Sequence, residues 1–196
     1  MKNIILSLSV LSIMAAAACA GAQAKNRGAQ YNKYVMDNNY FSCSVPAAWT
    51  LERDKDNDEE YKIYEIQLLA PKADKAPVSI FVSYYAKDNE DFNGHKDYID
   101  SNSKNALGET KSARENYDPI KKTTLHGIKS FLLSRERMVY LHPESKSDES
   151  VLLKEKFYIM PAKDGFYVLK FSAPKTAFAA NLPVFEKIAR SFKGKF

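Results

Sequence analysis

Two runs of β-branched and aromatic residues, separated by a short turn, constrain the fold of this chain most. In LLKEKFYIMPAKDGFYVLKFSAP the first run covers Leu152 to Met160, the turn PAKDG ends on Gly165, and the second run covers Phe166 to Ser172. Runs of this kind around a glycine-containing turn predict a β-hairpin. Similar runs lie at residues 40–45, 61–69, 78–86, 120–125 and 128–140. The chain is therefore expected to fold mainly as short antiparallel strands.

Two segments have a helical period instead. Between Asp91 and Leu107 the less polar residues recur at steps of three and four, and Gly108 suits the end of a helix. Near the carboxyl terminus a second helix is predicted, with Asn181 as its cap and Pro183 in its first turn. Its apolar stripe consists of Leu182, Phe185, Ile188, Ala189 and Phe192. Because strands outnumber helices, the expected fold class is α+β, an antiparallel β-sheet flanked by helices.

The amino terminus has the pattern of an export signal. Lys2 precedes an uncharged run from Ile4 to Ala18, and an A-x-A site ends at Ala24, just before Lys25. The run is shorter than the roughly 20 residues that cross a bilayer as a helix. Residues 1–24 are therefore predicted to be a cleaved signal peptide, and the protein is expected in the periplasm or outside the cell.

Export as a lipoprotein, with Cys19 acylated, is an alternative, because AAAC at residues 16–19 loosely resembles the lipobox of bacterial lipoproteins. An acylated Cys19 would anchor the protein to the envelope, and membrane contact is expected only in that case. Either route of export leaves Cys43 without a disulfide partner. Strand alternation places Cys43 on one face with Phe41 and Val45, which predicts a buried core thiol.

The rest of the chain is expected to form one domain. Residues 25–38 are polar and show no sustained period, which predicts a flexible segment before a domain at residues 39–196. The formal net charge is +5, with Lys and Arg interleaved with Asp and Glu along the sequence. Nucleic-acid binders concentrate these charges, so no nucleic-acid partner is expected. The charge supports solubility and weak attraction to anionic surfaces.

Several motifs resemble those of one superfamily. The segment FSCSVPAAWTL is similar to the F-S-[IV]-x-[IV]-P-x-x-W opening of PsbP-like domains, and FEKIARSF is similar to their closing F-x-x-I-x-x-S-F helix. The resemblance covers residues 38–194 and implies an α/β/α sandwich. The superfamily includes extrinsic proteins of the photosystem II oxygen-evolving complex, DcrB-type bacterial envelope lipoproteins and a nuclear Ran-binding factor. None of these is known for catalysis, so the resemblance implies a binding role.

An acidic run has part of the spacing of a calcium loop. Asp54, Asp56 and Asp58 stand at positions 1, 3 and 5, and Glu65 stands at position 12. An EF-hand needs glycine at position 6, where this chain has Glu59. The run is therefore predicted to be a solvated loop between two strands, and its three aspartates are only weak cation candidates.

The sequence shows no catalytic motif. The nucleophile-elbow pattern G-x-S-x-G and a glycine-rich phosphate loop are both absent, and His95, His126 and His142 lie far apart without metal-ligand spacing. We therefore expect no enzyme activity and no cofactor, although a hydrolase assembled from distant segments is a third hypothesis.

Aromatic residues are the candidates for a partner surface. In adjacent pairs such as Tyr84-Tyr85 and Phe166-Tyr167, one ring must point outward unless a helix layer covers that face. Helices on both faces are the favoured arrangement. If one face is open, we expect Tyr85, Tyr158 and Phe166 to contact a partner.

Two functions agree with these patterns. The first is an exported, non-enzymatic accessory protein that associates with or stabilises an envelope or membrane protein assembly. The alternative is a carrier of a small ligand or lipid, which would use an apolar cavity between the sheet and its helices.

Overall fold

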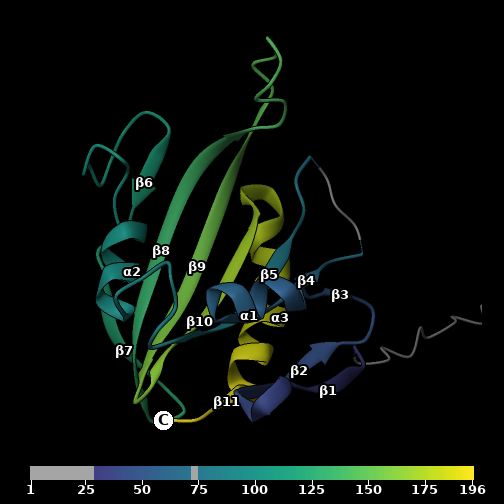
Figure 1. Cartoon of the computed structure of the whole chain (residues 1–196). Coiled ribbons are helices and arrows are strands. Elements are labelled where there is room, and N and C mark those ends of the chain that lie inside the picture. Colours follow the sequence, from purple (N-terminus) through teal and green to yellow (C-terminus); the bar gives the residue numbers. More distant parts are fainter. Residues whose placement is uncertain (1–28, 72–74) are drawn as a thin grey trace, which may run out of the picture.

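An eight-stranded antiparallel sheet forms the centre of the molecule (Figure 1). The computed structural model describes residues 29–71 and 75–196, so the predicted signal peptide and Cys19 lie outside the described residues. The strand order is β3-β4-β5-β10-β9-β8-β6, and β7 pairs with β8. The strands are β3 (Thr50–Glu52), β4 (Ile63–Leu69), β5 (Ser79–Ala86), β6 (Glu115–Tyr117), β7 (Lys121–Leu125), β8 (Ile128–Tyr140), β9 (Ser150–Ala162) and β10 (Gly165–Pro174).

The predicted hairpin is formed by β9 and β10, which pair from Gly165↔Ala162 along their lengths. Gly165 has φ +142°, a backbone conformation that residues with a side chain rarely adopt. A Cβ there would lie 2.0 Å from the carbonyl oxygen of Tyr85 on β5. The turn therefore requires glycine, because the backbone of the neighbouring strand passes directly beside it.

A second, three-stranded sheet lies against the first. It contains β1 (Tyr31–Val35), β2 (Phe41–Pro46) and β11 (Lys193–Gly194), with a 3-10 turn η1 (Asp37–Asn39) between β1 and β2. The prediction of a flexible segment is therefore wrong for residues 31–35. The side chains of β1 are largely exposed, which agrees with its polar sequence. Its backbone pairs with that of β2, and the buried side chain of Met36 follows it directly.

Within the described part of the chain, three α-helices complete the fold: α1 (Lys55–Tyr61), α2 (His95–Asn102) and α3 (Lys175–Ser191). Helix α3 begins earlier than predicted, so Asn181 is not its cap and Pro183 lies in its interior. The buried ring of Phe178 extends the apolar stripe toward the amino end of α3. Helix α2 falls within its predicted segment, whereas α1 replaces the predicted acidic loop.

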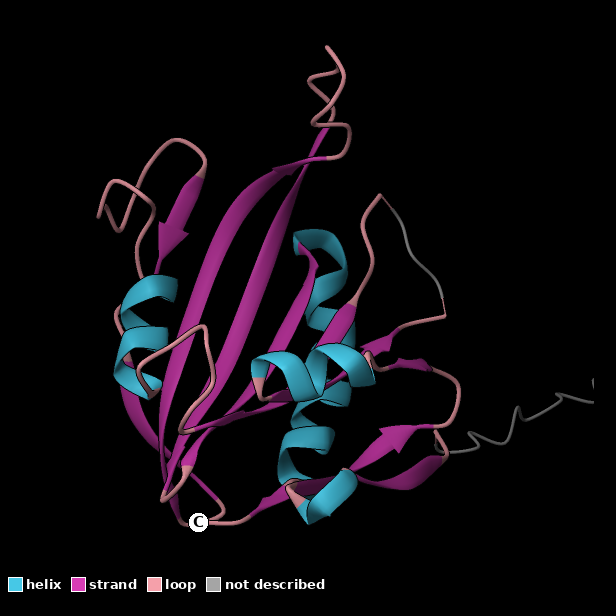
Figure 2. Cartoon of the chain, viewed as in Figure 1, coloured by secondary structure: helices cyan, strands magenta, loops and turns pink. Residues whose placement is uncertain are grey.

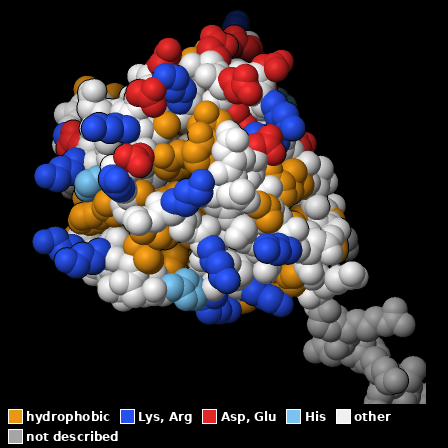
Figure 3. All heavy atoms as spheres, turned by 60° about the horizontal axis from the view of Figure 1, so that its bottom comes forward, with side chains coloured by type: hydrophobic (Ala, Val, Ile, Leu, Met, Phe, Trp, Pro, Cys, Tyr) orange, Lys and Arg blue, Asp and Glu red, His pale blue; other side chains and the backbone are white. Residues whose placement is uncertain are grey.

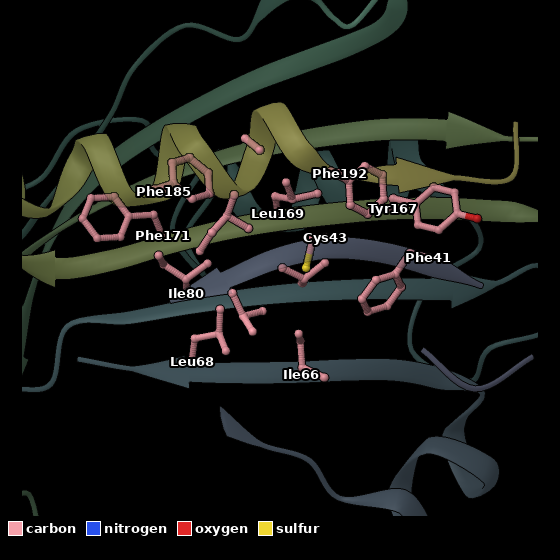
Figure 4. Packing of buried hydrophobic residues seen from close by; sticks show 14 of the residues in the cluster. Phe41, Cys43, Ile66, Leu68, Ile80, Tyr167, Leu169, Phe171, Phe185 and Phe192 are labelled. Atoms are coloured by element: carbon pink, nitrogen blue, oxygen red, sulfur yellow. The ribbon is translucent and has the colours of Figure 1, made fainter. Parts of the chain in front are cut away.

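The helices lie on both faces of the central sheet (Figure 2). Helix α3 contacts β9, β10 and β2 on one face, and α2 contacts β9 on the other. Between α3 and the sheet, Ile80, Leu169, Phe171 and Phe185 form part of a large buried cluster (Figure 4). The predicted α+β class and α/β/α sandwich are therefore confirmed. Among the described residues, no helix has both the length and the apolar character needed to cross a membrane.

Candidate functional site

The sheet face toward α2 carries an ionic cluster centred on Glu155 of β9. Arg135 Nε lies 2.6 Å and Arg137 Nε 3.1 Å from Glu155 Oε2, and Lys170 Nζ lies 3.5 Å from Oε1. Burial alone would raise the pKa of Glu155, but the charges of Arg135, Lys170 and Arg137 outweigh burial and hold that pKa below its ordinary value. Three neighbouring strands thus hold a buried carboxylate in its ionised form.

A cleft of about 580 Å³ opens on the same face, between α1 and β4. Its volume lies within the usual range for sites that receive a small molecule or a partner's side chains. Five carboxylate side chains line it: Glu52, Asp54, Asp58, Glu65 and Asp91. Arg53, Tyr61, Ile63, Gln67 and Tyr85 complete the wall. The lining therefore favours a cationic or hydrogen-bonding group.

Asp58 holds the cleft together from α1. Arg53 Nε donates to Asp58 Oδ2 at 2.6 Å, and the backbone N–H of Glu65 donates to Asp58 Oδ1 at 3.0 Å. Arg53 also donates to Asp37 Oδ2 at 2.9 Å, which ties the cleft to η1. Both oxygens of Asp58 are engaged, and the side chain covers the edge of β4, where an unpaired N–H would otherwise be open to another strand.

Glu65 points into the cleft from β4. The hydroxyl of Ser83 on the adjacent strand β5 donates to Glu65 Oε2 at 2.5 Å. Burial raises the pKa of Glu65, and the Ser83 hydrogen bond and the charge of Lys170 oppose this effect only in part. Glu65 therefore takes up a proton more readily than a solvent-exposed glutamate does.

The acidic run is not a loop. Residues 55–61 form α1, in which Asp56 is exposed and Asp58 is buried. Residues two apart on a helix do not face each other, so the alternate spacing of a calcium loop is lost. Within residues 29–71 and 75–196, no three His, Cys, Asp or Glu side chains are grouped as a metal site. The structure therefore does not bring Asp54, Asp56 and Asp58 together around one ion.

Two of the three aromatic candidates are buried. Tyr85 and Phe166 are only 9% and 1% exposed, and their rings stack at 4.7 Å. Phe92 and Tyr98, from the α2 region, cover Tyr85 with ring centroids 5.7 and 5.4 Å away. Tyr85 and Phe166 are therefore not exposed to a partner, because a helix layer covers them, which is the arrangement that the sequence favoured.

Tyr158, the third candidate, is half-buried beside α3. Its hydroxyl donates to both carboxylate oxygens of Glu186 at 3.3 Å, and its ring lies 5.7 Å from that of Phe185. The side chain is engaged within the fold, which leaves little of it for a partner.

Cys43 lies in the core, as predicted. It is buried among Phe41 and the other residues of the large cluster, and burial raises the pKa of its thiol to about 12. The thiolate is the nucleophilic form of cysteine, so this side chain is inert at neutral pH.

The three histidines remain apart. His95 stacks on Phe131 at 5.7 Å, His142 Nε2 lies 3.8 Å from Glu149 Oε2, and His126 occupies the β7–β8 turn. Each has its own local surroundings, and the fold does not gather them into one site.

Sequence reasoning missed both the cleft and the Glu155 cluster. A local signal existed for the cluster, because alternation places Arg135 and Arg137 on the same face as buried Leu133, and β9 repeats this pattern with Glu155 and Phe157. Their contact depends on the register Arg135↔Glu155, which local patterns do not specify.

Comparison with known proteins supports the fold. No protein-family model matches the chain, and no curated protein matches it in sequence. The structure is similar to the solution structure of cyanobacterial PsbP (CyanoP) from Synechocystis sp. PCC 6803, with a TM-score of 0.53 and 10% identity over 89% of this chain and 98% of that chain. It is also similar to a crystal structure from Bacteroides thetaiotaomicron VPI-5482, with a TM-score of 0.50 and 12% identity over 85% of this chain and 49% of that chain.

The chain therefore has a PsbP-like fold, as its sequence motifs indicate. At such low identity the likeness concerns the fold alone, because one fold carries many functions.

Proposed function

We propose that this chain is an exported, non-enzymatic accessory protein that binds a protein of an envelope or membrane assembly through the cleft between α1 and β4. The observation that carries this proposal is the carboxylate lining of the cleft, held in place by Arg53, Asp58 and the backbone of Glu65. A prearranged polar wall lowers the cost of ordering side chains on binding. Carboxylates around the opening favour a partner segment that carries Lys or Arg.

The state of the cleft side chains favours binding over catalysis. Asp58 has both oxygens engaged, and Ser83, which donates to Glu65, is itself buried. A nucleophilic serine needs a base that accepts its proton and a position that a substrate can reach. Ser83 has a carboxylate beside it but no access to a substrate, so the pair is structural.

Export is supported by the amino-terminal pattern of Lys2 and an apolar run that ends near Ala18. Mass spectrometry of the mature amino terminus tests it. A chain that begins at Lys25 supports a cleaved signal peptide, and a diacylated Cys19 supports the lipid anchor. An uncleaved Met1 in the purified protein would contradict export by either route.

Photo-crosslinking in cells tests the partner and the surface together. A photoreactive residue at Tyr61, which lines the cleft and is 36% exposed, is expected to capture one reproducible envelope or membrane protein. The matched control is Leu107, which is 83% exposed but lies outside the cleft. Equal capture from both positions, or no reproducible product from Tyr61, would contradict binding at the cleft.

The carrier hypothesis has less support, because side chains fill the space between the sheet and α3. Phe171 lies 4.7 Å from Phe178 and 5.5 Å from Phe185 between ring centroids, and all three are buried. Native mass spectrometry of the purified protein is expected to show the bare chain. A co-purifying lipid mass would favour the carrier instead.

A further inference from the structure

Lysine side chains gather at one end of the molecule, although they are dispersed in the sequence. The register Gly165↔Ala86 and Gly165↔Ala162 places the end of β5 and the β9–β10 turn side by side. Lys87 follows β5 and Lys163 lies in the turn, and the backbone N–H of Lys87 donates to the Asp164 carbonyl at 3.0 Å. Lys87 and Lys163 are both exposed, and they lie at one edge of the sheet although they are far apart in sequence.

The carboxyl-terminal strand brings further lysines to the same end. The backbone N–H of Lys195 donates to the Tyr167 hydroxyl at 2.9 Å, and that hydroxyl donates to the Tyr40 carbonyl at 2.9 Å. Lys195 lines one hollow with Lys87 and Lys163, and a second hollow of about 230 Å³ with Lys33 and Lys193. We call this surface the basic end, and its members are Lys33, Lys87, Lys163, Lys193 and Lys195.

The positive charge of the basic end is largely uncompensated. None of its five lysines forms a salt bridge with another described residue, and Lys195 Nζ donates to the Asn38 carbonyl. Asp37 pairs with Arg53 and Asp88 pairs with Lys62. Asp164 also lines the first hollow, so the five lysines outnumber the one other side-chain carboxylate of the two hollows. The surface therefore presents a net positive field to an approaching ligand.

Exposed apolar side chains lie among these lysines. Phe196 is 47% exposed beside Tyr167, with ring centroids 5.2 Å apart, and Val35 is 44% exposed in the second hollow. Figure 3 shows this face, where Lys and Arg side chains surround hydrophobic ones and acidic side chains gather along one border. Lysines around an exposed aromatic ring are typical of surfaces that meet lipid headgroups.

We propose that the basic end docks the folded domain on an anionic lipid membrane surface. All five charged members are lysines, which act as flexible point charges, whereas recognition of one fixed phosphate favours the planar fork of arginine. Point charges spread over one end of a molecule match the diffuse negative charge of a lipid layer. This docking does not depend on an acyl group, and it is separate from binding at the cleft.

Co-sedimentation of the chain from Lys25 onward with lipid vesicles tests the proposal. Binding is expected to vesicles of phosphatidylcholine mixed with phosphatidylglycerol, and to weaken strongly as salt is raised. The triple variant Lys33→Gln, Lys163→Gln, Lys193→Gln is expected to weaken this binding by about tenfold or more. These three side chains are exposed and unpaired, so circular dichroism should show an unchanged fold.

The matched control removes the same charge from the opposite end of the sheet. Lys75 pairs with Glu149, Lys146 lies in the β8–β9 loop, and Lys111 lies beside β6. The triple variant Lys75→Gln, Lys111→Gln, Lys146→Gln is expected to change vesicle binding by less than about threefold. Equal loss in both triple variants would overturn the proposal, since net charge alone would then explain binding.

Two further results would overturn it. One is equal binding to vesicles of phosphatidylcholine alone. The other is binding to a soluble anionic polysaccharide without binding to the mixed vesicles, which would assign the basic end to a different class of macromolecule.

Discussion

The two faces of the central sheet differ in kind. On β10, Leu169 and Phe171 point to the α3 face and are fully buried among apolar side chains, whereas Lys170 between them points to the other face and pairs with Glu155. One strand therefore contributes only apolar side chains to the α3 layer, whereas it gives the other layer both apolar Phe166 and Val168 and the charge of Lys170. This follows from the alternation of side chains along a strand.

The lengths of the covering helices explain the difference. Helix α3 runs over Lys175–Ser191 and, with the small sheet, closes its face, whereas α2 runs only over His95–Asn102 and covers the aromatic cluster around Tyr85. Beside this cluster, the same face carries buried Glu155 and the carboxylates of the cleft. The short helix thus leaves room for a polar cluster and a cleft beside its small core, whereas the long helix covers a larger apolar core. Five predictions test this comparison, from the largest expected effect to the smallest.

The largest effect is expected in the core under α3. Phe171→Ala should lower the free energy of unfolding by about 3–5 kcal/mol, because it opens a cavity between the sheet and the helix. Urea denaturation measures the change. The matched control is Phe81→Ala on the opposite face, where the ring is half-buried and the loss should be smaller. Equal losses at both positions would contradict the contrast between the faces.

Next is the ionic cluster on the α2 face. Glu155→Gln should lower the free energy of unfolding by about 2–3 kcal/mol, because it leaves Arg135 and its neighbours without a buried counter-charge. Glu144→Gln, in the exposed β8–β9 loop, should change it by less than about 0.5 kcal/mol.

This cluster also predicts a pH effect. The pKa of Glu155 is lowered in the folded protein, so its stabilisation is present above 4.5, the ordinary value, and is lost as pH falls through the lower folded value. Denaturation at a series of acidic pH values measures the free energy of unfolding. Its decrease with falling pH should be smaller in Glu155→Gln than in the parent chain. An unchanged acid slope would contradict the role assigned to the carboxylate.

A smaller loss is expected at the wall of the cleft. Asp58→Asn keeps an oxygen that can accept from the Glu65 N–H but loses the ion pair with Arg53, so thermal denaturation should show a loss of about 1–2 kcal/mol. Asp56→Asn on the exposed side of the same helix is the control and should have almost no effect. Equal losses of stability in Asp58→Asn and Asp56→Asn would contradict the role of Asp58 in the wall of the cleft.

The smallest effect is expected at Glu65, where the change of stability with pH has the opposite sign to that predicted for Glu155. Its pKa is raised by burial, so the folded protein holds a proton more readily than the unfolded chain. Stability should then decrease as pH rises from 4.5 to the raised folded value. Glu65→Gln should remove this dependence and raise stability at neutral pH by less than about 1 kcal/mol. Glu52→Gln at the exposed rim should leave the dependence intact.

Local patterns predicted most strands correctly. The expected strand at residues 128–140 is β8, Ile128–Tyr140, and the buried positions of β2 are those that alternation assigns to Phe41, Cys43 and Val45. Alternation and turn chemistry act over a few residues, so they are readable along the chain. The two missed elements, β1 and α1, have polar sequences without a clear period, and they are stabilised by contacts with other elements, β2 and β4.

The candidate site depended on contacts between different elements, which the pattern of a single strand or helix does not specify. Nothing near Asp58 in sequence shows that Arg53 and the edge of β4 bury it, and nothing near Tyr85 shows that Phe92 and Tyr98 cover it. Burial of a side chain is a property of the assembled layers, not of its own strand.

By itself, the sequence determined the hairpins, the glycine turn at Gly165, the inward side of each main strand and the resemblance to PsbP-like domains. Only the tertiary structure decided which helix covers each face, which carboxylates line the cleft, and that lysines scattered along the chain share one end. The physical reason is the distance along the chain over which each effect acts. Backbone preferences and side-chain alternation extend over a few residues. The burial of a sheet face and the electrostatic field of a surface depend on which segments the strand order brings together.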